Sequence, residues 1–300
     1  MLLKEFVTTS RSRLSGLYPD REAASITGIL CREFFSLEGY TFLVEPSRHL
    51  DDRDVQKALA AQDRLASGEP LQYVLGYTEF YGRRFNVSPA VLIPRPETEE
   101  LCRIATDAAV MLQRGRDAYG SNAAPVRILD LCTGSGCIAW TLAANVPGAR
   151  VVGLDISQEA LEVARRQHID SEGMVAPRFV QADIFDERAV LSALEGEAPF
   201  DMILSNPPYV LEKERAAMRR NVLDFEPSIA LFVPDDDFGL FYRKISFWAG
   251  KLLKTDSMGL VEINEAFGDG VSRIFEADGF REIKVFRDIS GRERIVRFKK

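Results

Sequence analysis

Short, continuous apolar runs alternate with helix-like segments from Val126 to the end of this 300-residue chain. Five such runs are VRILDL (126–131), VVGLDI (151–156), RFVQAD (178–183), DMILSN (201–206) and GLVEIN (259–264). Uninterrupted apolar strands separated by helices are typical of a parallel sheet that helices cover on both faces. The C-terminal segment adds two strands joined at Ser290-Gly291, which predict an antiparallel edge. The pattern therefore predicts an α/β fold with a mostly parallel, seven-stranded sheet.

The first seventy residues differ, because their apolar residues recur at helical spacing. In DREAASITGILCREFF (20–35), Asp20 is placed to cap an amphipathic helix. A second helix is predicted from Asp51 or Asp52 to the stop signals Gly68 and Pro70. This part of the chain therefore predicts a small helical domain over residues 1–70.

Residues 71–88 are rich in aromatic and β-branched side chains, with turn residues at Gly76 and Gly82. This composition predicts a small β-hairpin. A helix opening at Glu97 or Thr98 follows the prolines of VLIPRPETEE. The expected organisation is a helical domain over residues 1–70, a β-hairpin linker over 71–93 and an α/β domain over 94–300.

The net charge is −7, from 45 acidic and 38 basic residues. Proteins that hold nucleic acid by its phosphates usually have a basic excess or stripe, so direct nucleic-acid binding is not expected. Two histidines, His49 and His168, and four cysteines without a C-x-x-C spacing argue against a metal site or a Ser-His-Asp triad. No apolar stretch reaches the roughly 18 residues of a membrane helix, and no secretory signal is apparent. We therefore expect a cytoplasmic protein that uses neither metal nor membrane.

A glycine-rich turn and three acidic residues follow successive predicted strands. LDLCTGSGC places Gly134 and Gly136 at the first strand-to-helix turn, where the backbone and helix amides can approach a ligand. Asp155 ends the second strand, about 25 residues after Asp130, where it can accept hydrogen bonds from both ribose hydroxyls of a nucleoside. Asp183 ends the third strand and could meet an adenine amino group. Any one of these carboxylates could simply cap a helix, but together they predict a nucleoside-containing ligand.

The motifs ILDLCTGSGCIA, VVGLDIS, QADIF and SNPPYV resemble those of class I S-adenosylmethionine-dependent methyltransferases, which have a Rossmann-like fold. The resemblance implies S-adenosyl-L-methionine as cofactor and S-adenosyl-L-homocysteine as product, with the methionine part at the glycine loop, the ribose at Asp155 and the adenine near Asp183 and Ile184. The cofactor-binding residues that it implies are Asp130, Cys132, Thr133, Gly134, Ser135, Gly136, Asp155, Ile156, Asp183, Ile184 and Asn206.

The stretch SNPPY (205–209) follows the fourth strand, and its two prolines exclude both a helix and a central strand. Asn206 offers a side-chain carbonyl and Pro207 a backbone carbonyl, two acceptors that can orient a planar amino group and favour a pyramidal nitrogen. Pro207 and Pro208 hold the turn rigid, as positioning requires, and Tyr209 can lay its ring against the flat group. The stretch predicts methylation of an amino group on an sp2 carbon: adenine in DNA, guanine in ribosomal RNA, or glutamine in protein.

The segments PLQYVLGYTEFYGRRFNVSPAVLIPRPETEEL (70–101), FEPSIAL (225–231), GLFYRKI (239–245) and DISGRERIV (288–296) are similar to those of the peptide chain release factor glutamine methyltransferases, the PrmC or HemK family. The resemblance implies N5-methylation of the glutamine in the Gly-Gly-Gln loop of release factors, with a helical N-terminal domain that helps to dock the factor. It implies an amide pocket formed by Asn206, Pro207, Pro208 and Tyr209, with Arg95, Pro96, Glu97 and Thr98 close by. We expect the protein to be a monomer.

Two alternatives remain open at this point. The same pocket could serve an adenine or guanine of DNA or ribosomal RNA, although the large target-recognition segment of a DNA enzyme is not apparent. Arg95 and Glu97 could form an exposed ion pair of little energetic weight. The chain also departs from the family pattern where glycines or glutamine are usual, at Cys132, Pro234, Phe238 and Asn264-Glu265.

Overall fold

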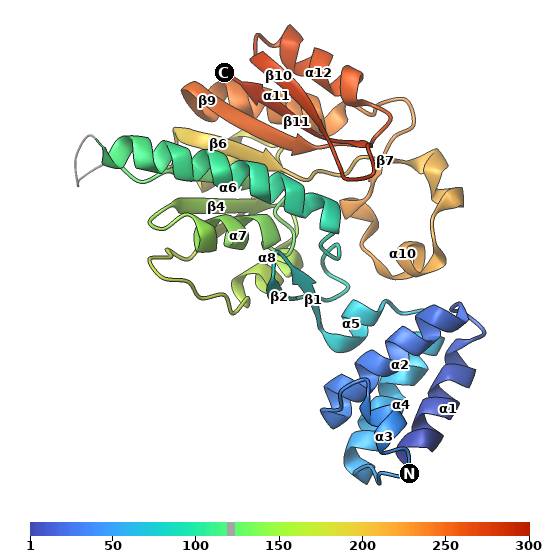
Figure 1. Ribbon diagram of the computed structural model, residues 1–300. Helices are drawn as coiled ribbons and strands as arrows, with labels where there is room; N and C mark the ends of the chain where they lie inside the picture. The colour runs from blue at the N-terminus through green and yellow to red at the C-terminus, as the bar shows by residue number, and fades with distance from the viewer. Residues whose placement is uncertain (119–123) are drawn as a thin grey trace. The chain divides into compact units, whose positions relative to one another are not determined.

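The computed structural model describes residues 1–118 and 124–300. The chain divides into two compact units (Figure 1). One unit comprises Met1–Gly76 together with Arg219–Phe225, and the other comprises Tyr77–Met218 together with Glu226–Lys300. Each unit has hydrophobic core residues of its own, so each can be described by itself.

The first unit is helical, as the sequence predicts. Its helices are α1 (Leu3–Leu14), α2 (Asp20–Phe35), α3 (Thr41–Val44), α4 (Asp52–Ala66), α5 (Leu71–Leu75) and α10 (Arg220–Phe225). The apolar faces of α1, α2 and α4 meet in a core in which Phe6, Leu30 and Leu65 are fully buried. Burying each such side chain contributes roughly 1.5–3 kcal/mol, which explains how short helices form one stable unit.

The sequence predicts helix caps at Asp20 and at Asp51 or Asp52, and the structure shows how α2 and α4 begin. Asp51 caps α4, since its Oδ1 accepts hydrogen bonds from the backbone nitrogens of Arg53 and Asp54 at 2.9 and 3.3 Å. The prediction at Asp51 is confirmed. Helix α2 begins at Asp20 itself, directly after Pro19, and no side-chain hydrogen bond caps it. The predicted cap at Asp20 is therefore wrong, because the residue lies inside the first turn.

The predicted hairpin is shorter than expected. Residues Leu71–Leu75 form helix α5, not a strand, because Pro70 precedes the helix and Gly76 ends it in a left-handed conformation with φ of 81°. The antiparallel hairpin consists of β1 (Tyr77–Phe80) and β2 (Arg83–Asn86). The expectation of a hairpin is confirmed, but its start at residue 71 is wrong.

A seven-stranded sheet forms the centre of the second unit (Figure 1). Its strands are β3 (Arg127–Leu131), β4 (Arg150–Asp155), β5 (Arg178–Gln181), β6 (Phe200–Ser205), β9 (Leu253–Glu262), β10 (Arg281–Arg287) and β11 (Glu293–Lys299). The strand order is β10-β11-β9-β6-β3-β4-β5. Strands β9, β6, β3, β4 and β5 pair in parallel, and β11 pairs antiparallel with both of its neighbours. The predicted sheet with its antiparallel edge is confirmed.

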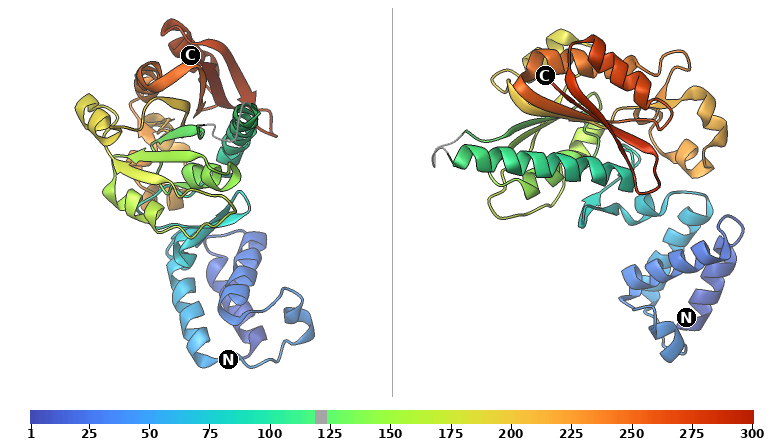
Figure 2. Two further views of the ribbon diagram at one scale, coloured as in Figure 1. Left: turned by 90° about the vertical axis from the view of Figure 1, so that its left-hand side faces the viewer. Right: turned by 45° about the horizontal axis from the view of Figure 1, so that its top comes forward.

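Helices cover both faces of this sheet (Figure 2). They are α6 (Pro96–Asp117), α7 (Cys137–Asn145), α8 (Gln158–Arg165), α9 (Glu187–Ala193), α11 (Leu240–Leu252) and α12 (Gly268–Ala277). Buried residues of α6, α7 and α8 pack in one core, and those of α9, α11 and α12 in another. Neighbouring residues of β3 alternate between them, with Ile128 in the first and Leu129 in the second. Because both faces of the strand are covered, Ile128, Leu129 and Leu131 of β3 are all apolar.

Two differences in strand length affect the site. Strand β5 ends at Gln181, so Asp183 lies two residues beyond it. Strand β9 begins at Leu253, earlier than predicted, and ends at Glu262. Between β6 and β9 lie a short parallel pair, β7 (Val210–Leu211) with β8 (Phe232–Val233), and two 3-10 turns, η1 (Glu212–Ala217) and η2 (Ser228–Ala230). Within residues 1–118 and 124–300, no helix combines the length and apolarity needed to cross a bilayer.

Candidate active site

A pocket of about 300 Å3 lies in the second unit, at the carboxyl ends of β3 and β4. Of the residues predicted to bind cofactor, those lining it are Cys132, Thr133, Gly134, Ser135, Asp155, Ile156, Asp183, Ile184 and Asn206. Residues from 90–94 and 227–230 also contribute to the walls, and these segments were not predicted as pocket walls. Ligands of open α/β sheets bind at this edge, and the volume is at the small end of the range for small-molecule sites.

The glycine loop after β3 owes its shape to left-handed residues. Cys132, Gly134 and Gly136 have φ of 59°, 53° and 76°, a region that glycine adopts without a steric penalty. Gly136 does not line the pocket; it precedes α7, and a Cβ added to it would lie 2.9 Å from Cζ of Phe179. Gly136 therefore serves the packing of α7, whereas Gly134 leaves room for a ligand.

Asp155, at the end of β4, holds this loop. Its Oδ2 accepts a hydrogen bond from the backbone nitrogen of Gly134 at 2.8 Å, and its Oδ1 accepts one from the nitrogen of Ser157 at 3.0 Å. Burial raises the pKa of Asp155, and the backbone donors oppose that rise. Each carboxylate oxygen can accept more than one hydrogen bond, so both remain able to accept from a bound ligand.

The other two acids have different surroundings. Asp130 is fully buried beneath the loop and does not line the pocket; its Oδ2 accepts a hydrogen bond from the Thr133 hydroxyl at 2.5 Å. Burial raises the pKa of Asp130 to about 7. Asp183 lines the pocket while its Oδ1 accepts from the nitrogen of Phe185 at 2.9 Å, which stabilises the turn after β5. Asp130 thus supports the loop from below, and Asp183 faces the ligand space.

The Asn-Pro-Pro-Tyr stretch follows β6, as predicted, but only Asn206 and Pro208 line the pocket. The Asn206 Nδ2 donates a hydrogen bond to the hydroxyl of Thr98 at 3.1 Å. The Tyr209 hydroxyl donates to Oε1 of Glu262 at 2.8 Å, so it points away from the pocket toward β9. Burial, followed by the neighbouring Glu262, raises the pKa of Tyr209.

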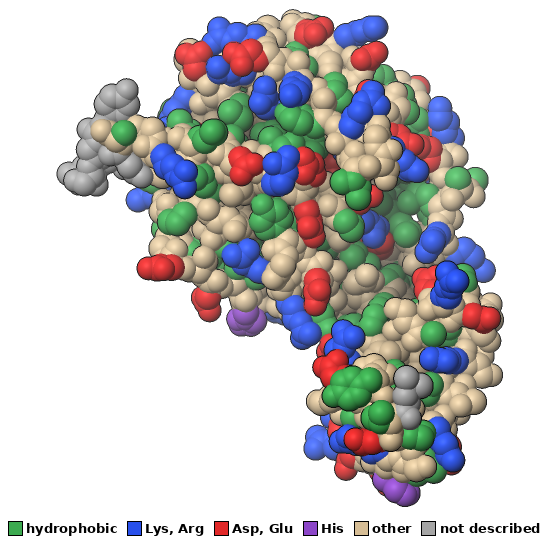
Figure 3. All heavy atoms as spheres, viewed as in Figure 1, with side chains coloured by type: hydrophobic (Ala, Val, Ile, Leu, Met, Phe, Trp, Pro, Cys, Tyr) green, Lys and Arg blue, Asp and Glu red, His purple; other side chains and the backbone are tan. Residues whose placement is uncertain are grey.

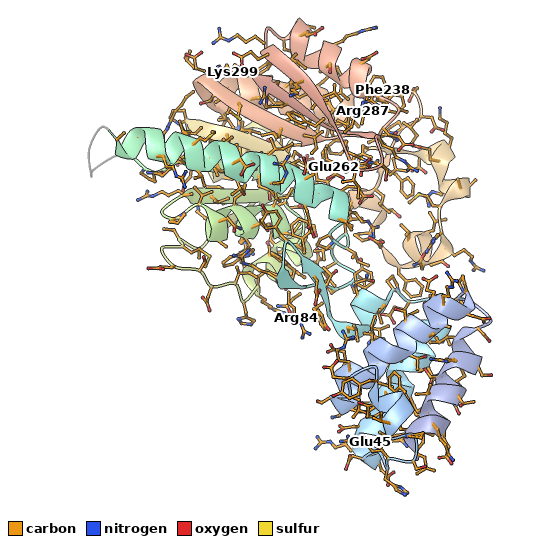
Figure 4. The ribbon with its side chains drawn as sticks, viewed as in Figure 1. Glu45, Arg84, Phe238, Glu262, Arg287 and Lys299 are labelled. Carbon is orange, nitrogen blue, oxygen red and sulfur yellow. The ribbon has the colours of Figure 1, made fainter. Side chains whose placement is uncertain are left out.

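Glu262 is a site residue that the sequence did not single out. It ends the central strand β9, is fully buried, and its Oε2 accepts a hydrogen bond from the Thr98 hydroxyl at 2.6 Å (Figure 4). Burial raises the pKa of Glu262, and the hydroxyls of Thr98 and Tyr209 oppose that rise. The signal was present in the sequence, because Glu262 follows the apolar residues Leu260 and Val261 and precedes Ile263, and an unpaired charge in apolar surroundings is costly.

Arg95 and Thr98 line the pocket, whereas Pro96 and Glu97 do not. The Arg95 guanidinium pairs with Oε1 of Glu226 at 2.6 Å, and Oε2 of the same carboxylate accepts from the nitrogen of Ile93 at 3.1 Å. The alternative of an Arg95–Glu97 ion pair is therefore wrong, because the partner lies 131 residues away in sequence. Glu226 is almost fully buried, so this pair fastens the segment before α6 to the wall after α10.

The sheet order, the glycine loop after β3, the acid that ends β4 and the pocket beside them define a class I methyltransferase fold. A methyltransferase domain model matches residues 123–231, and a PrmC N-terminal domain model matches residues 5–76. The chain is 37% identical to the release factor glutamine methyltransferase of Bacteroides thetaiotaomicron, covering 95% of this chain and 96% of the relative. It is 33% identical to that of Flavobacterium psychrophilum, covering 99% of both. The chain belongs to the release factor glutamine methyltransferase family.

Solved structures support the fold alone. The catalytic domain of hMettl16 matches with a TM-score of 0.52 at 12% identity, covering 84% of each chain. The family resemblance and the Rossmann-like fold class predicted from the sequence are confirmed. Membership of this family implies S-adenosylmethionine as the methyl donor, and the residues that line the pocket fit it, since they offer the backbone turn and carboxylates that a nucleoside requires.

Proposed function

We propose that the protein transfers a methyl group from S-adenosylmethionine to the side-chain amide nitrogen, N5, of the glutamine in the Gly-Gly-Gln loop of peptide chain release factors. Asn206 carries this proposal. It lines the pocket, and its Nδ2 is engaged by Thr98. In the described part of the chain no hydrogen bond ends on its Oδ1, which leaves that oxygen to accept from an incoming N–H.

The cofactor would lie along the carboxyl edge of the sheet. The loop Cys132–Gly136 would hold the methionine part, Asp155 the ribose hydroxyls, and Asp183 with Ile184 the adenine. A bound sulfonium supplies an electrophilic methyl group and an excellent leaving group. The product would be S-adenosylhomocysteine, and no metal takes part in this proposal.

The protein's own residues would prepare the acceptor. An amide nitrogen is a poor nucleophile because its lone pair is delocalised. Asn206 Oδ1 and the carbonyl of Pro207 would accept hydrogen bonds from its two N–H bonds, orienting the nitrogen toward the methyl group. Held in this way, the amide nitrogen would take the methyl group from the sulfur of the donor and would lose one of its two protons to solvent. The rigid turn at Pro207 and Pro208 would keep both acceptors in place.

The partner would be the release factor, met in the cytoplasm. The helical N-terminal part, for which we propose the bounds 1–70, would help to dock it, with the linker over 71–93 and the catalytic part over 94–300. We also propose that the protein acts as a monomer. On the face drawn in Figure 3, basic and acidic side chains are interspersed and form no continuous basic stripe, which favours a protein acceptor over DNA or ribosomal RNA.

A labelled methyl-transfer assay tests the proposal. The protein and labelled S-adenosylmethionine are given an unmodified release factor, the same factor with its loop glutamine changed to alanine, or bulk DNA and ribosomal RNA. We expect label on the intact factor alone. Label on nucleic acid with the factor untouched would refute the acceptor while leaving the fold and the cofactor in place.

The variant Asn206→Ala extends this assay. We expect it to lower turnover by about 100-fold or more, as removal of a transition-state hydrogen-bonding group does. Its affinity for S-adenosylmethionine, measured by calorimetry, should stay near that of the wild type. If cofactor binding vanished as well, Asn206 would be a structural residue of the pocket and its role as acceptor would be wrong.

A further inference from the structure

A buried carboxylate is linked by hydrogen bonds to both ends of the Asn-Pro-Pro-Tyr stretch. Glu262 Oε1 accepts a hydrogen bond from the Tyr209 hydroxyl at 2.8 Å, and Oε2 accepts one from the Thr98 hydroxyl at 2.6 Å. Thr98 in turn accepts from Nδ2 of Asn206 at 3.1 Å. The first and last residues of the four-residue motif are therefore fastened to one carboxylate, directly at Tyr209 and through Thr98 at Asn206.

The direction of these hydrogen bonds fixes the orientation of the Asn206 amide. A hydroxyl has a single proton to donate, and that of Thr98 points at Glu262. The Thr98 oxygen can then only accept from Asn206. The NH2 end of the Asn206 side chain suits this position and the carbonyl end does not, since two oxygens without a proton between them repel each other. The Asn206 carbonyl is thereby turned toward the pocket that Asn206 lines.

Glu262 is itself well fixed. It ends β9 between β6 and β11, and both strands pair with the C-terminal half of β9, β6 as far as Val261 and β11 as far as Glu262 itself. The backbone carbonyl of Glu262 accepts a hydrogen bond from the buried Tyr242 hydroxyl at 3.1 Å. Thr98 lies in the first turn of α6 and is also buried. Sites held by packed strands and helices keep their geometry better than sites on loops alone.

We propose that Thr98 and Glu262 are positioning residues, which set the Asn206 amide so that its Oδ1, and not its NH2, meets the methyl acceptor. This inference deepens the proposed function and rests on it where it concerns turnover. The orientation of the Asn206 side chain, in contrast, is a property of the protein alone. A network that only stabilises the fold would leave turnover unchanged in a folded variant.

The kinetic test compares two substitutions at Thr98. Thr98→Val keeps the shape but removes the hydroxyl, whereas Thr98→Ser keeps the hydroxyl. For methylation of the unmodified release factor we expect kcat of Thr98→Val to fall by about 10- to 150-fold, the range for one hydrogen bond to a charged group. Thr98→Ser should recover to within about threefold of the wild type. The KM for the factor and the affinity for S-adenosylmethionine should change little in both.

Thr141→Val is the matched control. Thr141 is also fully buried, on α7, and its hydroxyl has no hydrogen-bond partner among the residues that the structure describes, so the same substitution there removes no such bond. We expect kcat of this variant to equal that of the wild type. Equal kcat for Thr98→Val and Thr98→Ser would overturn the proposal. So would a loss in Thr98→Val that appeared equally in cofactor affinity and in the unfolding temperature.

A second measurement does not depend on the acceptor. In protein labelled with 15N-asparagine, the side-chain NH2 signal of Asn206 can be assigned by its absence from Asn206→Asp. We expect slow hydrogen exchange for the proton facing Thr98 in the wild type and in Thr98→Ser, and fast exchange in Thr98→Val. Equal exchange in all three would overturn the inference. If the expected protection is seen but no release factor is methylated, the proposed function fails and the positioning role stands.

Discussion

The carboxylate of Asp155 offers a quantitative test of the cofactor site. Both of its oxygens accept a backbone hydrogen bond, Oδ2 from Gly134 and Oδ1 from Ser157. In Asp155→Asn one oxygen becomes an NH2 group, which faces an N–H donor whichever way the amide is turned. One loop hydrogen bond is then lost, and one ribose hydroxyl loses its acceptor. A hydrogen bond to a charged group is worth about 1.5–3 kcal/mol, so we expect S-adenosylmethionine to bind roughly 10- to 150-fold more weakly.

Isothermal titration calorimetry at constant ionic strength measures this change. Glu159→Gln is the matched control, because Glu159 is an exposed acid in the first turn of the following helix and undergoes the same change of charge. Its cofactor affinity should remain that of the wild type. If Asp155→Asn bound within about threefold of the wild type, the carboxylate would not hold the ribose. If both variants lost affinity equally, general electrostatics would explain the effect instead of direct contact.

Two predictions concern stability. A Cβ added to Gly153 would lie 2.7 Å from both Phe179 Cδ1 and Thr133 Oγ1, so Gly153→Ala should lower the free energy of unfolding in urea by about 1–3 kcal/mol. Gly115→Ala on α6 is the control: a Cβ there would have no described neighbour within 4 Å, so this change should not lower the free energy of unfolding. Burial raises the pKa of Asp130 to about 7, so the folded state holds this proton more tightly than the unfolded state; the resulting stability is present below pH 4 and lost as pH rises to about 7. Asp130→Asn should remove a few kcal/mol of that pH dependence. If the free energy of unfolding changed by the same amount between pH 4.5 and pH 8 in the wild type and in the variant, this prediction would be wrong.

The fold could be predicted from the sequence because its signals are local. Continuous apolar strands, helices between them and a glycine turn identify a parallel sheet without any knowledge of distant contacts. The errors arose where one local signal overrode another: the aromatic and β-branched composition of 71–88 suggested a hairpin from residue 71, but Pro70 and Gly76 bound a helix there. Asp20 looked like a cap because aspartate favours that position, yet the helix already includes it.

The site was predicted in part, since pocket residues that follow strands share one edge of the sheet. What the sequence could not provide is the pairing of distant polar groups. Thr98 and Glu262 are 164 residues apart, and Tyr209 and Glu262 are 53 apart. Arg95 likewise finds Glu226 and not its neighbour Glu97. Such pairs follow from the three-dimensional packing of segments far apart in the sequence, which no local pattern encodes.

The departures from the family pattern are accommodated in physically distinct ways. Cys132 adopts φ of 59°, so the loop keeps the left-handed conformation that a glycine would favour, and the backbone pays a strain of about 1–3 kcal/mol. The ring of Phe238 stacks on Phe267, with centroids 4.5 Å apart and planes 10° apart. This stack covers Gly270, where an added Cβ would lie 2.7 Å from Phe238 Cζ.

Asn264 shows the same kind of accommodation on the other side of this turn. Its Nδ2 donates to Oε2 of Glu214 in η1 at 3.0 Å, and its Oδ1 accepts from the nitrogen of Ala266 at 3.1 Å. Both Phe238 and Asn264 therefore fasten the chain after the Asn-Pro-Pro-Tyr stretch to the turn between β9 and α12. Neither contributes a hydrogen bond to Asn206 or Asp155 in the described residues. The residues that join these segments can therefore differ from the family pattern without affecting the reacting groups. Asn206, which would meet the acceptor, is held separately by Thr98 and Glu262.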